Sequence, residues 1–196
     1  MSAKLKIIDF VQKELENSSK GAHRLDHTKR VYSLAMQIGE GLQVSKKVIQ
    51  AAALLHDVGR PKETDTGVSH SILSGEMSKP LLQELRYTET EIEQIIDAIR
   101  THRFSEGMEP TSLEGKILSD ADKLDAIGAV GIYRAIAQAE SQGKGLIGFL
   151  HHADEKLLNL KDLMFTTKGK ILAMRRHEVL QRFVDELRDE IAEYYL

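Results

Sequence analysis

Apolar residues recur at helical spacing along almost the whole chain, and no segment alternates with a period of two. Proline, which interrupts helices, occurs only at positions 61, 80 and 110. A length of 196 residues suits one domain with a sizeable core. The chain is therefore predicted to be all-α, a single-domain helical bundle over residues 1–196.

Capping signals indicate where several of these helices begin. Ser45 is a suitable N-cap, and Thr88 with Glu91 has the spacing of a capping box. The pattern predicts helices over about 4–16, 26–39, 45–57, 69–85, 88–102, 111–125, 126–141 and 146–159, with a long final helix from about 166.

Two places interrupt the helical pattern near the middle of the chain. Gly59 and Pro61 block continuation of the third helix, and the polar residues 62–68 read as a loop. Pro80 lies inside the next apolar stripe, so the boundary of that helix is weakly defined.

Composition and charge exclude several kinds of protein. A formal charge of −3 argues against stable nucleic-acid binding, and no apolar stretch approaches the roughly 20 residues that span a bilayer. The N-terminus has no secretory signal, so a cytoplasmic location is expected. Cysteine is absent, so a metal could be held only by imidazole and carboxylate, which suits Mn, Mg, Co, Ni, Fe or Zn.

His56 and Asp57 stand side by side at the end of the apolar run 48–55. Burying a polar group without a partner costs roughly 2–7 kcal/mol, and burying a charge costs far more. One divalent cation would compensate both side chains at once. This pair therefore predicts a metal-dependent hydrolase.

Two further ligand types occur in apolar, periodic segments: His27 in the second expected helix and Asp122 in a later one. Together with His56 and Asp57 they would give an ion four protein ligands. Positions left open on a six-coordinate ion can hold water and a substrate phosphate oxygen. His23 lies one turn before His27, and Asp120 competes with Asp122 but could equally be a solvated residue.

Other polar residues have a functional and a structural reading. Asp125, one turn beyond Asp122, could orient a water or a ligand imidazole, or form an ordinary surface salt bridge with Lys123 or Arg134. The candidate substrate contacts are His70, His102, Arg24 and Arg103. The two histidines could instead hydrogen-bond to backbone carbonyls, and the two arginines could instead be solvated.

The order His27, His56-Asp57, Asp122 resembles the HD-domain phosphohydrolase superfamily. Residues 53–60 (ALLHDVGR) and 120–129 (DADKLDAIGA) look like its small bacterial YpgQ-like and YedJ-like subfamily. Residues 165–169 (FTTKG), leading into 175–178 (RRHE), are also similar to that group, so the resemblance covers most of the chain.

The resemblance implies an all-α HD fold, with a metal-site core over about 20–130 and a C-terminal helical extension over about 131–196. It implies one divalent metal ion, favours Asp122 over Asp120 as a ligand, and suggests a nucleoside triphosphate pyrophosphohydrolase. A cyclic-nucleotide phosphodiesterase, a 5′-nucleotidase, an alarmone hydrolase and a non-catalytic, metal-stabilised nucleotide sensor are the alternatives. The expected partner is a small-molecule nucleotide, and the chain is expected to be a monomer or homodimer.

Asp57 or Asp122 would aim the attacking water in such an enzyme, while Arg60 and Lys123 would offset charge in the transition state. Arg60 stands where many members of the superfamily have lysine or an acidic residue. It can grip a phosphate but cannot donate a proton near neutral pH. The two-metal branch adds a tandem histidine pair before the last aspartate, whereas His70 and His102 stand alone here, which favours one metal. Contact with substrate is the expected role of His70 and His102, and contact with a second ion is the lesser alternative.

Overall fold

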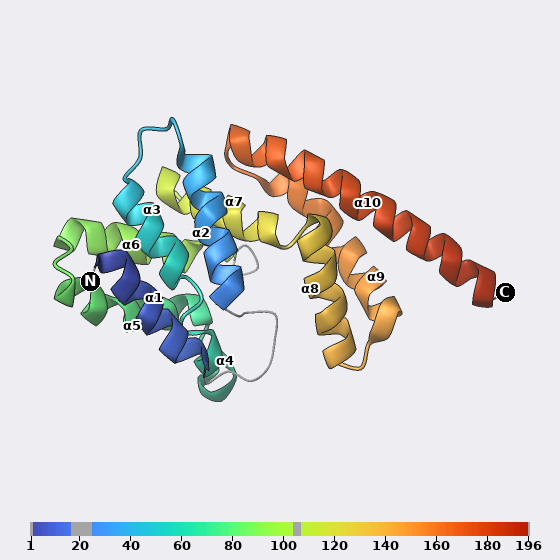
Figure 1. Ribbon diagram of the computed structural model, residues 1–196, viewed down its shortest axis with the longest axis horizontal. Helices are drawn as coiled ribbons and strands as arrows, with labels where there is room; N and C mark the ends of the chain where they lie inside the picture. The colour runs from blue at the N-terminus through green and yellow to red at the C-terminus, as the bar shows by residue number, and fades with distance from the viewer. Residues whose placement is uncertain (1, 17–24, 104–106, 196) are drawn as a thin grey trace. The chain divides into compact units, whose positions relative to one another are not determined.

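The computed structural model describes residues 2–16, 25–103 and 107–195. Within these ranges the chain forms ten α-helices and one 3₁₀-helix, and no strand (Figure 1). The all-α prediction is therefore confirmed. Among these described helices, none combines the length and apolarity needed to cross a membrane.

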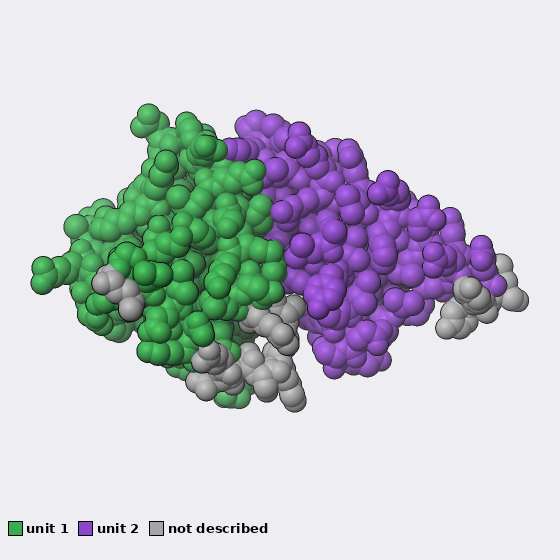
Figure 2. Space-filling model, viewed as in Figure 1, with its two compact units in different colours: residues 1–122 green, residues 123–196 purple. Residues whose placement is uncertain are grey.

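The chain separates into two compact units, residues 1–122 and 123–196, which Figure 2 colours separately. The division predicted from the sequence, a core over about 20–130 and an extension over about 131–196, lies close to this boundary. The assignment of both parts to one domain stays a prediction.

The first unit is built around α3, which packs against α1, α2, α5 and α6. Its apolar positions from Val48 to Leu55 are buried, since α3 lies among neighbours rather than on the surface. The helices of this unit are α1 (Ala3–Glu16), α2 (Leu25–Gly39), α3 (Lys46–Leu55), α4 (Arg60–Thr66), α5 (His70–Glu84) and α6 (Glu89–Thr101).

Helix α7 (Leu113–Asp125) begins in the first unit and carries Asp122 to its end. Hydrogen bonds attach it to the rest of that unit. Glu114 accepts from the backbone amide of Ser45 over 2.9 Å, and Ser119 donates to the carbonyl of His102 over 3.1 Å. These contacts link α7 to the start of α3 and the end of α6.

The predicted caps are confirmed. The side chain of Ser45 accepts a hydrogen bond from the amide of Val48, and Thr88 and Glu91 form a reciprocal capping box at the start of α6. Both interactions satisfy amides that the first helical turn leaves without an intrahelical partner.

The loop predicted over residues 62–68 is wrong, because residues 60–66 form α4. Pro61 lies in the first turn of this helix, where a residue without a backbone N–H is tolerated, so it starts a helix instead of preventing one. Gly67, with φ of 68°, ends α4 in the left-handed region. Pro80 does not interrupt α5, which continues to Glu84.

The second unit contains the remaining elements. They are α8 (Gly128–Ser141), α9 (Gly145–Glu155), η2 (Leu157–Leu163) and α10 (Thr167–Tyr195). The helix predicted over 146–159 is shorter than expected, since its last residues belong to the 3₁₀-helix η2. α10 contacts α8 and η2, and η2 also contacts α9.

Candidate metal centre

His56 caps the C-terminal end of α3 and is fully buried. Its Nδ1 atom donates a hydrogen bond to the carbonyl oxygen of Ala53 over 2.9 Å. Burial lowers the pKa of His56 to about 3, although the neighbouring Asp57 carboxylate acts in the opposite direction. The imidazole is therefore neutral near pH 7, and its Nε2 carries a lone pair suited to a metal ion.

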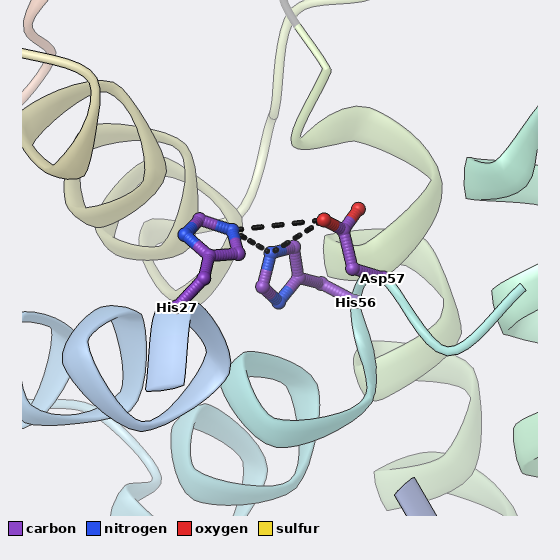
Figure 3. Close-up of side chains that lie close together, drawn as sticks. All are labelled: His27, His56 and Asp57. Carbon is purple, nitrogen blue, oxygen red and sulfur yellow. Dashed lines mark hydrogen bonds and ion pairs between the residues drawn. The ribbon is translucent and has the colours of Figure 1, made fainter. Parts of the chain in front are cut away.

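The side chains of His27 from α2 and Asp57 lie next to this nitrogen, and both are buried (Figure 3). His27 Nε2 is 3.3 Å from His56 Nε2 and 3.6 Å from Asp57 Oδ2. His56 Nε2 is 3.8 Å from the same carboxylate oxygen. Three donor atoms from two segments of chain thus converge.

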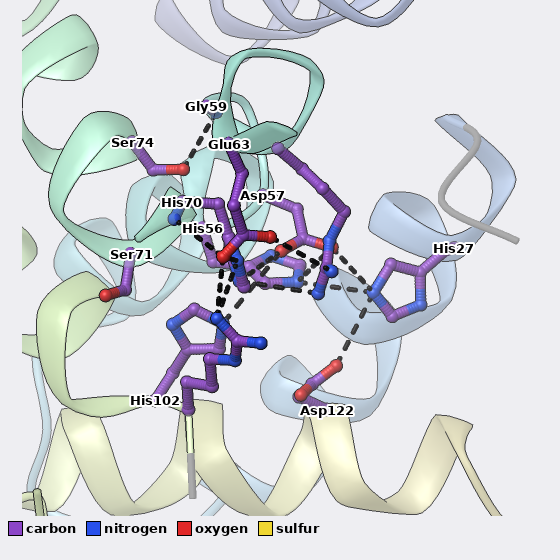
Figure 4. Close-up of polar contacts among 12 residues, drawn as sticks. His27, His56, Asp57, Gly59, Glu63, His70, Ser71, Ser74, His102 and Asp122 are labelled. Carbon is purple, nitrogen blue, oxygen red and sulfur yellow. Dashed lines mark hydrogen bonds and ion pairs between the residues drawn. The ribbon is translucent and has the colours of Figure 1, made fainter. Parts of the chain in front are cut away.

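Asp122 on α7 adds a second carboxylate. Its Oδ1 atom lies 3.5 Å from His27 Nε2, and the side chain is 33% exposed (Figure 4). Burial acts to raise the pKa of Asp122, but the surrounding imidazoles, that of His27 foremost, outweigh it and hold the pKa below the ordinary value. Asp122 is therefore ionised at neutral pH.

The spacing and chemistry of these four side chains fit a divalent cation. Donors about 2.1 Å from one ion lie roughly 3.0–3.4 Å from one another, close to the separations in this cluster. The His56 lone pair faces a second imidazole nitrogen at 3.3 Å, and a positive ion between nitrogens and carboxylates would stabilise that arrangement. His27, His56 and Asp57 form a group that could hold such an ion.

A second group of donors surrounds the other oxygen of Asp57. Oδ1 lies 3.1 Å from His70 Nε2 and 4.0 Å from His102 Nε2, and both histidines are buried. His102 donates its Nδ1–H to the carbonyl of Ile99, and burial lowers its pKa. Both histidines predicted to bind substrate therefore lie beside Asp57. His102 also makes the hydrogen bond to a backbone carbonyl that was the structural alternative for these histidines.

Glu63 on α4 connects His70 to two arginines and was missed by the sequence reasoning. Its Oε1 atom is 3.0 Å from His70 Nδ1 and accepts from Arg103 over 2.7 Å. Its Oε2 atom is 3.8 Å from Arg60 Nη1. Burial acts to raise the pKa of Glu63, but the hydrogen bond from His70 and the adjacent charges lower it to about 2. No sequence signal marks Glu63, because the polar residues 62–68 predict a loop.

Arg60 and Arg103 bring two guanidinium groups to this region. Arg60 Nε donates to Asp57 Oδ2 over 3.1 Å, and its Nη2 is 3.3 Å from His70 Nε2. Arg103 lies beside the same imidazole, with Nη1 3.4 Å from Nδ1. The centre thus joins metal-ligand donors to positively charged groups that can bind phosphate oxygens.

The remaining predicted residues have other contacts. Lys123 is buried, donates to the carbonyl of Leu163 and lies over the ring of Phe165. Asp125 is fully buried and pairs with Arg134, so the reading of an exposed surface pair is wrong, although the predicted partner is present.

Asp120 is also fully buried, so the idea of a solvated side chain is wrong for it. Arg24, predicted as a substrate contact, and His23, the alternative to His27, lie outside the described residues.

The helical fold and the His-Asp cluster define a class of protein. A family model described as HD domain matches residues 24–127, and the chain belongs to the HD domain family. It is an HD-domain hydrolase whose buried His-Asp cluster is suited to a divalent metal.

Individual relatives match over most of the chain. It is 37% identical over 190 residues to YpgQ of Bacillus subtilis (strain 168), covering 93% of this chain and 90% of that protein. The crystal structure of Bacillus subtilis YpgQ in complex with ADP matches with a TM-score of 0.79 and 31% identity, covering 96% and 94% of the two chains. A predicted HD superfamily hydrolase from an uncultured Thermotogales bacterium matches with a TM-score of 0.73 and 31% identity, covering 95% and 91%.

Proposed function

We propose that this protein is a nucleoside triphosphate pyrophosphohydrolase that uses one divalent metal ion. The observation that carries the proposal is the convergence of four donor side chains beside two arginines. The donors are His27, His56, Asp57 and Asp122, and the arginines are Arg60 and Arg103. The ADP complex of the similar YpgQ supports a nucleotide as the substrate.

The residues of the centre have separate roles in the proposed reaction. A divalent ion held by the four donors would supply Lewis-acid activation of water and of the phosphoryl oxygens. Asp57 or Asp122 accepts a hydrogen bond from the attacking water and aims its oxygen at the α-phosphorus. Arg60 and Arg103 bind phosphate oxygens and offset the charge that develops there. A P–O bond to water forms, the α–β bridging bond breaks, and pyrophosphate leaves with the electron pair.

Other roles predicted from the sequence remain part of this proposal. Lys123 is assigned to charge compensation and Asp125 to orientation near Asp122. His70 and His102, beside Asp57, are assigned to substrate binding, as is Arg24. A cytoplasmic location and a monomeric or homodimeric state also stay predictions.

A panel of nucleotides crossed with Mn, Mg, Co, Ni and Zn tests the proposed function, with products separated by chromatography. Nucleoside triphosphates should give a nucleoside monophosphate and pyrophosphate in equal amounts. Release of orthophosphate, or opening of a cyclic nucleotide, would assign a different phosphohydrolase activity. Nucleotide binding without turnover in the presence of every metal would identify a sensor instead of an enzyme.

A further inference from the structure

Asp57 stands between two groups of donor atoms. Its Oδ2 atom lies near His27 and His56, while its Oδ1 atom lies 3.1 Å from His70 Nε2 and 4.0 Å from His102 Nε2. Asp57, His70 and His102 are all buried and form a second group whose residue types could hold a metal ion. On ligand chemistry alone, the centre could therefore bind two ions that share Asp57.

The guanidinium of Arg60 contacts both Asp57 and His70. Its Nε atom donates to Asp57 Oδ2 over 3.1 Å, and its Nη2 atom is 3.3 Å from His70 Nε2. Arginine has donors and no acceptor, so a hydrogen bond to Nε2 uses the lone pair of that nitrogen. A second metal ion would need the same lone pair.

The contact between Glu63 and His70 favours the tautomer that accepts from Arg60. The Nδ1 atom of His70 is 3.0 Å from Glu63 Oε1, which favours a proton on Nδ1 and the lone pair on Nε2. Arg103 adds a second positive group 3.4 Å from the imidazole. Two guanidiniums beside one histidine oppose the approach of a further dication, because like charges repel.

We propose that Arg60 limits the centre to one divalent ion, because its guanidinium holds the His70 Nε2 atom that a second ion bound by Asp57, His70 and His102 would need. The inference rests on the proposed function for the first ion only. It assigns Arg60 a positioning role toward the centre in addition to phosphate binding. It also predicts that removing the guanidinium opens a second metal site.

Metal titration of the full chain tests this, with Mn²⁺ alone as the probe after treatment with chelator. Wild type should bind one Mn²⁺ per chain, and Arg60→Ala should bind two, measured by calorimetry and by metal analysis after dialysis. Arg60 is partly exposed, with a side chain 29% accessible, so its truncation leaves no core cavity. The double variant Arg60→Ala, His70→Ala should return to one ion, because it removes a donor of the second site.

Arg103→Ala is the matched control, since it removes a second guanidinium that contacts His70 and Glu63. It should still bind one ion. Two Mn²⁺ ions sharing Asp57 should give a broadened, coupled paramagnetic resonance signal in Arg60→Ala alone. Two ions in wild type, one ion in folded Arg60→Ala, or two in Arg103→Ala would each overturn the proposal. Pyrophosphate release is measured separately, so failure of the proposed activity leaves the metal count interpretable.

Discussion

His56 and His102 are held by the same kind of contact, although they come from different helices. Each caps the C-terminal end of its helix and donates Nδ1–H to the carbonyl three residues earlier, over 2.9 Å for His56 and 2.5 Å for His102. Their ring centroids are 5.1 Å apart and their planes nearly perpendicular, at 82°. The Nε2 atom of each ring lies within about 4 Å of an Asp57 oxygen. The backbone therefore orients both imidazoles toward one carboxylate.

Metal-free protein should lose stability in acid because of these buried imidazoles. Unfolding returns His56 from a pKa of about 3 to an ordinary value near 6.5, so below that pH the unfolded chain binds a proton that the folded chain excludes. Stability should fall as pH drops from about 6.5 toward 3, by about 2 kcal/mol at pH 5 from His56 alone. The lowered pKa of His102 acts in the same direction.

Urea unfolding in chelator at pH 7 and pH 5 measures this effect. The difference between wild type and His56→Gln isolates the contribution of His56, because the other histidines are common to both chains. The variant should lose less stability on acidification than wild type. Equal pH dependence of the two proteins would contradict the buried, neutral state of His56.

Replacing Asp57 should remove the metal and the activity together. Asp57→Asn keeps the volume but loses the charge that lies 3.6 Å from His27 and 3.8 Å from His56. Removing a residue that only hydrogen-bonds to a metal ligand already weakens metal binding by about 10–100-fold. Loss of a ligand itself should therefore weaken Mn²⁺ binding by at least about 100-fold. Calorimetry and a turnover assay provide the measurements.

Asp26→Asn is the matched control, since Asp26 is exposed, pairs with Arg30 and lies beside His27 in the sequence. It should keep its metal and full activity. Full metal content in Asp57→Asn would remove Asp57 from the ligand set.

Local sequence signals were sufficient for much of the fold and of the metal cluster. The structure brings His27, His56, Asp57 and Asp122 together, and each had been recognised as a ligand type within a helical apolar stripe. Periodicity predicts that the apolar faces of these helices pack, and the resemblance to the superfamily favours Asp122 over Asp120 as the fourth ligand.

Contacts between distant residues could not be predicted in this way. The sequence pattern does not single out Glu63, because Pro61 predicts a helix break, whereas it lies in the first turn of α4. The partner of Lys123, the carbonyl of Leu163, is 40 residues away. Nothing in the spacing of charged residues distinguishes such a buried contact from a catalytic role.

Glu63→Gln should weaken substrate binding more than it slows the chemical step. The Glu63 carboxylate accepts from Arg103 and lies beside His70, and its pKa of about 2 keeps it ionised at working pH. A neutral amide would hold both cationic partners less firmly, so KM for nucleotide should rise about 10-fold, the loss of one hydrogen bond to a charged group. Metal content should not change.

Steady-state kinetics give KM and kcat separately for this variant. Glu76→Gln, at an exposed position on α5, is the control and should behave as wild type. A fall in kcat at unchanged KM would mean that Glu63 acts in the transition state and not in holding the arginines.

Gly59→Ala should be strongly destabilising, because the backbone leaves no room for a side chain there. An added Cβ would lie 2.6 Å from both Leu73 Cβ and the backbone nitrogen of Ser74, whose hydroxyl accepts from the Gly59 amide over 2.9 Å. Since backbone cannot yield easily, the cost should be about 2–4 kcal/mol, measured by urea unfolding. Gly67→Ala is the comparison: its φ is 68° but nothing lies within 4 Å of the added Cβ, so about 1 kcal/mol is expected. A smaller loss for Gly59→Ala than for Gly67→Ala would contradict the close packing of α5 against the segment that carries Asp57 and Arg60.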